Sequence, residues 1–209
     1  MIDISIPLSA QTLPWPGDQP FHCGWSCEIA RGDSVNLATI TSSFHVGTHA
    51  DAPFHVHPDW PASDALVPSA FIGDAVVLEL PEPLRTIEAL SIAMLEPLVR
   101  EAFAPRLLLR TGTTVASGTF PEDWPALAPE TADWLVARGV VLWGVDAPSV
   151  DRRQSKELLV HRALLGRGAF VLENLDLRRA QSGRYELIAP PVAVTGADAA
   201  PVRALLRAL

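Results

Sequence analysis

Residues 130–145 read Glu-Thr-Ala-Asp-Trp-Leu-Val-Ala-Arg-Gly-Val-Val-Leu-Trp-Gly-Val, and this stretch decides the fold class. The pattern over 130–138 predicts a helix, and Gly139 is a typical helix stop because glycine accepts the left-handed conformation. The compact apolar run over 139–145 predicts a buried strand. The same order recurs downstream, where a helix capped by Ser155 and running to about residue 166 precedes a strand-like run over 169–175. Alternating helices and strands of this kind predict an α/β or α+β domain built in layers.

The chain before this stretch is richer in strands. Alternating or compact apolar patterns predict strands over residues 1–6, 21–29, 35–44, 75–80 and 106–110. A helical pattern runs over 91–103 with a kink at Pro97, and residues 200–209 predict a final amphipathic helix. These patterns leave the order of the strands open.

The amino-acid composition excludes several classes of protein. The 209 residues are 48% hydrophobic and 19% charged, which suits one domain over residues 1–209 with a sizeable core and excludes a disordered chain. Sixteen basic residues are scattered among 24 acidic ones, so we expect no nucleic-acid partner. Two cysteines, the absence of a signal-like start and apolar runs too short to cross a bilayer predict a cytoplasmic protein with reduced thiols.

Four of the six histidines fall within residues 45–57. Every ionisable side chain in this segment occupies an odd position, so an extended chain would place them all on one face. A fully extended strand would, however, separate His45 from His49 by roughly 13 Å, and a shared metal ion therefore favours a bend at Gly47. We expect His45, His49 and Asp51 to form a metal-ligand set, because imidazole nitrogens and carboxylate oxygens bind zinc-like ions.

Two residues later in the chain can complete such a site. His161 shares a helix face with leucines and is expected to point inward, and Glu173 lies within an apolar strand where an unpaired carboxylate would be costly. Taken singly, His161 also fits a capped or surface histidine of a helix. Glu173 taken singly also fits an acid at a strand end that points to water. With Asp51 and Glu173 able to bridge, five ligands suffice for two divalent ions. His55 would then be free for proton transfer.

Other motifs carry less information. The chain has no phosphate-binding glycine loop and no Gly-x-Ser-x-Gly nucleophile turn, so nucleotide use and serine hydrolysis have little support. Cys23 and Cys27 cannot complete a structural zinc site alone and are expected to be free, partly buried thiols. His22 and His57 are expected at the rim of a site or in ordinary hydrogen bonds.

The segment His45-Val46-Gly47-Thr48-His49-Ala50-Asp51-Ala52-Pro53-Phe54-His55 resembles the His-x-Gly-[Thr/Ala]-His-x-Asp-Ala-Pro-x-His signature of the cyclase-like metal-dependent hydrolases. Within that superfamily the chain is most similar to the bacterial kynurenine formamidase family. The narrower similarity rests on Trp15-Pro16-Gly17-Asp18, Asp146-Ala147-Pro148-Ser149-Val150-Asp151, Ser155-Lys156, Leu172-Glu173 and Tyr185-Glu186-Leu187-Ile188-Ala189. It covers essentially the whole chain. Arg152 departs from the family, in which a proline is expected at this turn.

The resemblance implies a single-domain α/β fold of the layered, swivelling type, a homodimer and two Zn²⁺ ions per subunit. By position it makes His45, His49 and Asp51 ligands of one ion, and Asp51, His161 and Glu173 ligands of the other. It makes His55 the proton donor and acceptor and Trp15 a substrate contact. The implied reaction is hydrolysis of a small aromatic formamide, N-formyl-L-kynurenine, to L-kynurenine and formate.

Two alternatives remain open from the sequence. One is another hydrolase of the same superfamily, such as an enzyme acting on an isatin-like ring. The other is a catalytically silent metal-binding protein, although such a protein has no use for the free imidazole of His55 beside a complete ligand set. The metal is also open, because Mn²⁺ and Co²⁺ accept similar ligands to Zn²⁺.

Overall fold

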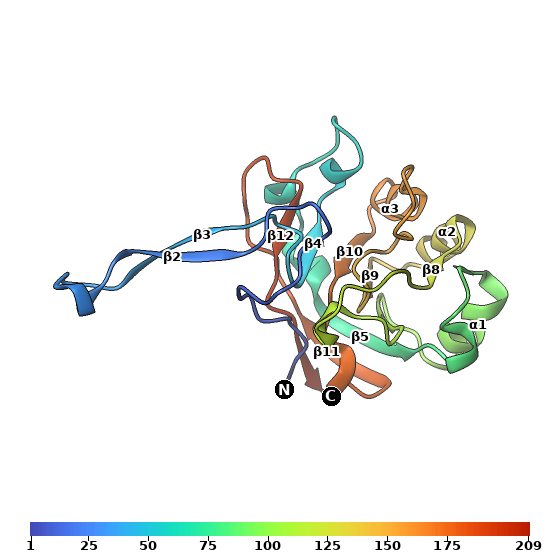
Figure 1. Ribbon diagram of the computed structural model, residues 1–209. Helices are drawn as coiled ribbons and strands as arrows, with labels where there is room; N and C mark the ends of the chain where they lie inside the picture. The colour runs from blue at the N-terminus through green and yellow to red at the C-terminus, as the bar shows by residue number, and fades with distance from the viewer.

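A nine-stranded sheet forms the centre of the molecule (Figure 1). The computed structural model describes all 209 residues, Met1–Leu209. Across the sheet the strand order is β1-β13-β11-β5-β7-β9-β10-β4-β12. In that order the strands span Ile2–Asp3, Leu205–Ala208, Gly183–Ile188, Ile72–Glu79, Arg106–Arg110, Leu142–Val145, Phe170–Glu173, His49–Asp51 and Ala199–Pro201.

The middle of the sheet is parallel and its flanks are antiparallel. Strands β5, β7, β9 and β10 run parallel, whereas β4 and β12 on one side and β11, β13 and β1 on the other pair antiparallel. Helices α1 (Ile92–Glu101), α2 (Pro129–Ala137) and α3 (Leu159–Leu165) lie together on one side of the central strands (Figure 1). Parallel strands joined through helices confirm the predicted α/β fold in layers.

Side chains of the central strands point alternately to the two faces of the sheet, so the core forms one cluster on each face. In β7, Leu107 and Leu109 point into a cluster shared with Leu95 of α1 and Leu135 of α2, whereas Leu108 points into a second cluster behind the sheet. All five side chains are buried. Because successive side chains of a strand face opposite sides, a strand buried on both faces must be apolar at every position. This explains the continuous apolar runs seen in the sequence.

The predicted helices and strands of the central region are largely confirmed. The 91–103 pattern forms α1 with Pro97 inside the helix, and the 106–110 pattern forms β7. The 130–138 pattern forms α2, and Gly139 follows it with a φ of 89°. The prediction for 155–166 starts too early, because α3 begins at Leu159. Ser155 instead accepts a hydrogen bond from the backbone N–H of Leu158, which turns the chain before the helix.

The predicted helix over 200–209 is wrong. These residues form part of β12 and all of β13, and β13 pairs with both β1 and β11. Alanine, leucine and arginine favour a helix only weakly, by tenths of a kcal/mol per residue, so pairing with two strands outweighs that preference. Strand β12 likewise pairs with β4 at the other edge of the sheet. The strand predicted over 1–6 is shortened to β1, with one further bridge at Ser5.

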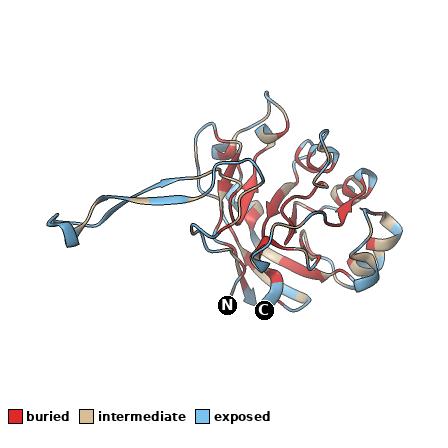
Figure 2. Ribbon diagram, in the orientation of Figure 1, coloured by how far each residue is buried: buried red, intermediate tan, exposed pale blue.

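Two smaller sheets lie outside the central one. Strands β6 (Ala89–Leu90) and β8 (Ala126–Leu127) form a short parallel pair, and β2 (His22–Cys27) and β3 (Leu37–Thr41) form a hairpin arm. The arm extends away from the body of the molecule and is largely exposed (Figures 1 and 2). No helix in the structure has the length and apolar character needed to cross a membrane.

Candidate active site

Five of the predicted site residues meet around β4 and β10, two neighbouring strands on one flank of the sheet. His49 and Asp51 lie on β4, and Glu173 ends β10, directly opposite His49 in the antiparallel register. His161 reaches the same point from α3, and His45 reaches it from the turn before β4. Apart from the partly buried His45, all of these residues are buried. The structure therefore brings together side chains that are up to 128 positions apart in the chain.

The turn before β4 sets the relation between the first two histidines. Gly47 has a φ of 73°, and Nδ1 of His45 lies 3.1 Å from Nε2 of His49. The predicted bend at Gly47 is thus confirmed, and the extended segment is limited to three residues. Thr48 fixes the turn from the other side, because its hydroxyl donates to the backbone oxygen of Asn174 at 2.6 Å.

The donor atoms of the cluster are spaced as ligands of a metal are. Oδ1 of Asp51 lies 3.2 Å from Nδ1 of His45 and 3.3 Å from Nε2 of His49. Nε2 of His161 lies 3.1 Å from Oδ2 of Asp51 and 3.1 Å from Oε1 of Glu173. Metal–ligand bonds of about 2.0–2.1 Å in a tetrahedron separate neighbouring ligand atoms by about 3.3 Å. Two overlapping groups, joined at Asp51, match this spacing.

The charges of the cluster test whether a cation fits. Oδ1 of Asp51 is buried and has no hydrogen-bond partner, which is costly for a carboxylate. Burial disfavours charge on His49, yet Asp51 and Glu173 outweigh it and raise the pKa of His49 to about 9. Likewise, burial opposes protonation of His161, but Asp151, Asp51 and Glu173 raise its pKa well above the usual value. The buried carboxylates thus require positive charge between them, and a divalent cation fits this set.

Hydrogen-bond acceptors outside the ligand cluster orient two of these imidazoles. Nδ1 of His49 donates to the backbone oxygen of Gly47 at 2.9 Å, and Nδ1 of His161 donates to Oδ2 of Asp151 at 2.7 Å. A neutral imidazole has one donor and one acceptor nitrogen, so each contact leaves the Nε2 lone pair directed at the cluster. Metal-binding histidines are usually held by such partners.

His55 lies beside the cluster without joining its two ligand groups. It ends a short 3₁₀ turn, Pro53–His55, and its ring centre lies 4.5 Å from that of His45 and 5.5 Å from that of His161. Nδ1 of His55 lies 3.7 Å from Oδ2 of Asp198, and Nε2 of His45 lies 3.0 Å from the same oxygen. His45, His55 and Asp198 form a third group of potential ligands, so geometry alone permits a second role for His55.

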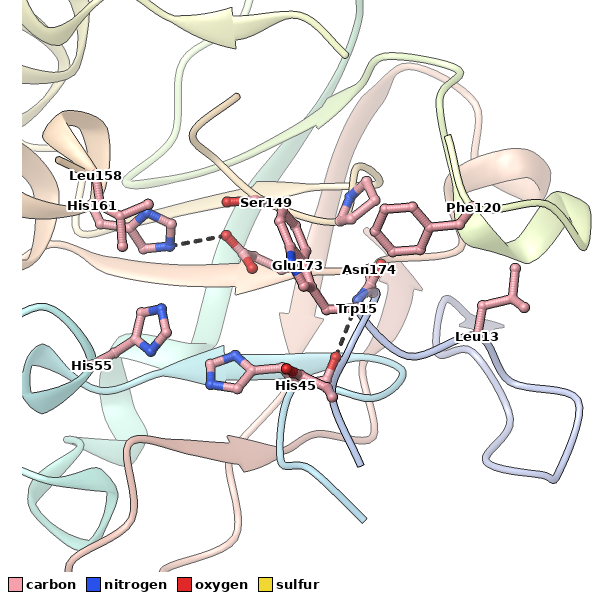
Figure 3. Close-up of a pocket in the computed structure, with 12 residues that line it drawn as sticks. Leu13, Trp15, His45, His55, Phe120, Ser149, Leu158, His161, Glu173 and Asn174 are labelled. Carbon is pink, nitrogen blue, oxygen red and sulfur yellow. Dashed lines mark hydrogen bonds and ion pairs between the residues drawn. The ribbon is translucent and has the colours of Figure 1, made fainter. Parts of the chain in front are cut away.

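A cavity of about 270 Å³ opens onto the cluster (Figure 3). In Figure 3, His55 and His161 lie on one side and Phe120 on the other, with Glu173, Trp15 and His45 between them. The ring of Trp15 packs edge-on against that of Phe120, with centres 5.6 Å apart. The cavity thus joins an aromatic wall to a set of polar, metal-binding groups. The lining residues are Leu13, Trp15, Asp18, His45, His55, Phe120, Pro148, Ser149, Leu158, His161, Glu173 and Asn174.

The remaining candidates lie elsewhere. His22 is exposed on the arm, and His57 stacks on Trp60 with ring centres 4.8 Å apart. Arg152 forms ion pairs with Asp123 and Glu88 and contacts no residue of the cluster. Both cysteines are free, as predicted, although Cys23 is exposed and only Cys27 is partly buried.

Sequence patterns did not assign a role to two carboxylates. Asp151 occurs ten residues before His161, and an acid shortly before a buried histidine is a signal that could have suggested it. Asp198 contacts a histidine 153 positions away, within a stretch of small residues that has no periodic pattern. Only the folded chain identifies it.

Comparison with known proteins shows the family to which the chain is similar. The family model described as "Putative cyclase" matches residues 2–152. A kynurenine formamidase of Bacillus cytotoxicus is 41% identical over 208 residues, covering 100% of this chain and 97% of the relative. A kynurenine formamidase of Bordetella petrii is 42% identical, covering 99% of this chain and 97% of the relative.

Solved structures support the fold separately. A crystal structure of an isatin hydrolase bound to a product analogue superposes with a TM-score of 0.82 at 22% identity, covering 98% of this chain and 90% of that one. At that identity the likeness concerns the fold alone. The family model and the relatives matched over nearly their whole length establish that the chain belongs to the Cyclase family and, within it, to the family of the bacterial kynurenine formamidases.

Proposed function

We propose that residues 1–209 act as one metal-dependent hydrolase domain that cleaves N-formyl-L-kynurenine to L-kynurenine and formate. The observation that carries this proposal is that the ligand cluster and the aromatic rings of Trp15 and Phe120 line one cavity (Figure 3). An aryl formamide has the matching shape, with a polar formyl group beside an aromatic ring. The kynurenine formamidases that are about 41% identical over the whole chain support the choice of substrate.

The two ligand groups suit two divalent ions. We assign His45, His49 and Asp51 to one ion and Asp51, His161 and Glu173 to the other, with Asp51 shared. Three imidazoles and two carboxylates favour Zn²⁺, and Mn²⁺ or Co²⁺ accept the same atoms. When bound, such ions supply a nucleophile from water at neutral pH and polarise a carbonyl oxygen.

The protein's own residues would orient the substrate and move a proton. Trp15 and Phe120 would hold the aromatic ring at the wall of the cavity, where an aromatic pair contributes about 0.5–1.5 kcal/mol beyond burial of its area. His55 would protonate the departing arylamine nitrogen, because an anilide anion is a poor leaving group. Its ring centre lies 4.5 Å from that of His45 and 5.5 Å from that of His161, close enough to serve a substrate held at the cluster.

We also propose that the enzyme is a homodimer in which the arm contacts a second copy. A lone two-stranded hairpin is marginally stable in water, so β2 and β3 need a surface to pack on. The arm exposes five large apolar side chains, which are Trp25, Ile29, Val35, Leu37 and Ile40. Sedimentation of the purified protein tests this, since a monomer at micromolar concentration would contradict it.

The two free thiols further support a cytoplasmic location, where cysteines stay reduced.

A turnover assay tests the proposed reaction. Purified, zinc-loaded protein should hydrolyse N-formyl-L-kynurenine faster than isatin, and a chelator should abolish turnover. His55→Ala should keep its metal content and lose about 10²- to 10⁴-fold in kcat, the range expected for a general acid. His57→Ala is the matched control, because His57 stacks on Trp60 away from the cluster. Preference for isatin would contradict the substrate assignment, and an unchanged rate in His55→Ala would contradict the role of His55.

A further inference from the structure

Asp198 occupies a defined position at the edge of the site. It lies just before β12, and its backbone oxygen accepts a hydrogen bond from the N–H of Ala52 at 2.9 Å, next to the ligand strand β4. The same loop is tied down again where Ser63 donates its N–H to the oxygen of Ala197 at 2.9 Å. The Asp198 side chain is 44% exposed, so its charge is stabilised by solvent as well as by its neighbours.

One oxygen of Asp198 faces two histidines with different proposed roles. Oδ2 lies 3.0 Å from Nε2 of His45, and Nδ1 of the same ring faces Asp51 and His49. An ionised carboxylate can only accept hydrogen bonds, so Nε2 of His45 must be the donor. The lone pair of a neutral His45 is then left on Nδ1, the atom that points into the cluster.

The same oxygen lies 3.7 Å from Nδ1 of His55. This distance is longer than a hydrogen bond but within ion-pair range, and apo sites often show such contacts before they tighten. A proton held on Nδ1 by the carboxylate leaves Nε2 of His55 as the nitrogen that exchanges a proton with a substrate. Asp198 therefore connects a metal ligand to the group that moves the proton.

We propose that Asp198 is a positioning residue that orients both His45 toward the metal and His55 toward the substrate. The proposal rests on the metal-dependent hydrolysis proposed above. It completes a pattern in the site, because His49 is already held by the oxygen of Gly47 and His161 by Asp151. Partners of this kind typically change metal affinity or activity by about 10- to 100-fold when they are removed.

Asp198→Asn tests the proposal, with Asp64→Asn as its matched control. Asp64 accepts a hydrogen bond from the N–H of Gly196 at 3.2 Å, so it anchors the same loop and touches no histidine. Zinc affinity is measured by chelator competition, and kcat and KM are measured on N-formyl-L-kynurenine. We expect Asp198→Asn to weaken zinc binding and lower kcat by about 10- to 100-fold each, with KM nearly unchanged. Asp64→Asn should leave zinc affinity, kcat and KM unchanged.

A double mutant separates the two contacts. In a His55→Ala background and at saturating zinc, adding Asp198→Asn should no longer lower kcat, because the imidazole that it would orient is absent. Its effect on zinc affinity should remain, because His45 is still present. Unchanged zinc affinity and kcat in Asp198→Asn would overturn the proposal, and so would equal losses in Asp64→Asn. A zinc stoichiometry below two ions per chain at saturating zinc would overturn it as well, because Asp198 would then be a ligand itself. If the wild-type enzyme lacks formamidase activity, the proposed function fails, and zinc affinity alone still decides the contact with His45.

Discussion

Replacing Gly47 with alanine should lower both the free energy of unfolding and the affinity for zinc, and only the second effect should be specific to this glycine. Gly47 has a φ of 73°, a conformation that costs a residue with a Cβ about 1–2 kcal/mol. A Cβ at this position would come within 2.7 Å of Cδ2 of Leu8, but Leu8 is 41% exposed and can swing aside. The nearest backbone atom, the oxygen of Ile6, lies at 3.5 Å, an ordinary contact. The expected loss in the free energy of unfolding is therefore about 1–2 kcal/mol, set by the backbone.

The effect on metal binding should be at least as large as the effect on stability. The same residue sets the bend between His45 and His49, and its carbonyl oxygen accepts the Nδ1–H of His49. Relaxing φ toward negative values would turn that carbonyl away and separate the two imidazoles. We expect zinc affinity to fall by about 10- to 100-fold, as for the loss of other partners of metal ligands.

The matched control is Gly139→Ala. Gly139 has a φ of 89° after α2, nothing lies within 4 Å of an added Cβ, and the residue is remote from the cluster. Urea unfolding of the metal-free proteins should give similar losses for both variants, whereas chelator competition should show weakened zinc binding for Gly47→Ala only. Wild-type zinc affinity in Gly47→Ala, or an equal loss of affinity in Gly139→Ala, would refute the reasoning.

Three other perturbations probe the site and the core. Zinc at 100 times its dissociation constant should raise the free energy of unfolding by about 2.7 kcal/mol per ion, so a melting temperature unaffected by chelator would contradict a metal centre. Glu173→Gln retains an oxygen for the N–H of Val150 but loses charge, so elemental analysis should show less than two ions per chain, and full occupancy would contradict the assignment. Burial outweighs the hydrogen bonds from Thr111 and Gly112 and raises the pKa of Asp146 to about 6. The stability that protonated Asp146 contributes is thus complete below about pH 4 and is lost as the pH rises through 6, by about 3 kcal/mol. Asp146→Asn lacks this titration, so the difference in unfolding free energy between wild type and variant should change by most of that amount from pH 4 to 7, and a constant difference would contradict it.

Local patterns predicted much of the fold because the local preferences and the tertiary structure agree there. The strand β7 is apolar at its three central positions, which only a strand buried on both faces requires. The C-terminal segment shows the opposite case. Its leucines and alanines favour a helix, but the free edges of β1 and β11 lie next to it in space, and pairing with them decides its conformation. No pattern within ten residues contains that information.

The candidate site likewise has one part that the local sequence predicts and another part that only the fold brings into place. The sequence by itself determined which residue types could bind a metal, since His45, His49 and Asp51 lie so close in the chain that one bend at Gly47 brings them together. Only the tertiary structure decided that β10 lies beside β4 with Glu173 opposite His49, and that the loop before β12 carries Asp198 to His45. Short-range geometry follows from a few backbone angles, whereas contacts across more than a hundred residues depend on the order in which strands pair.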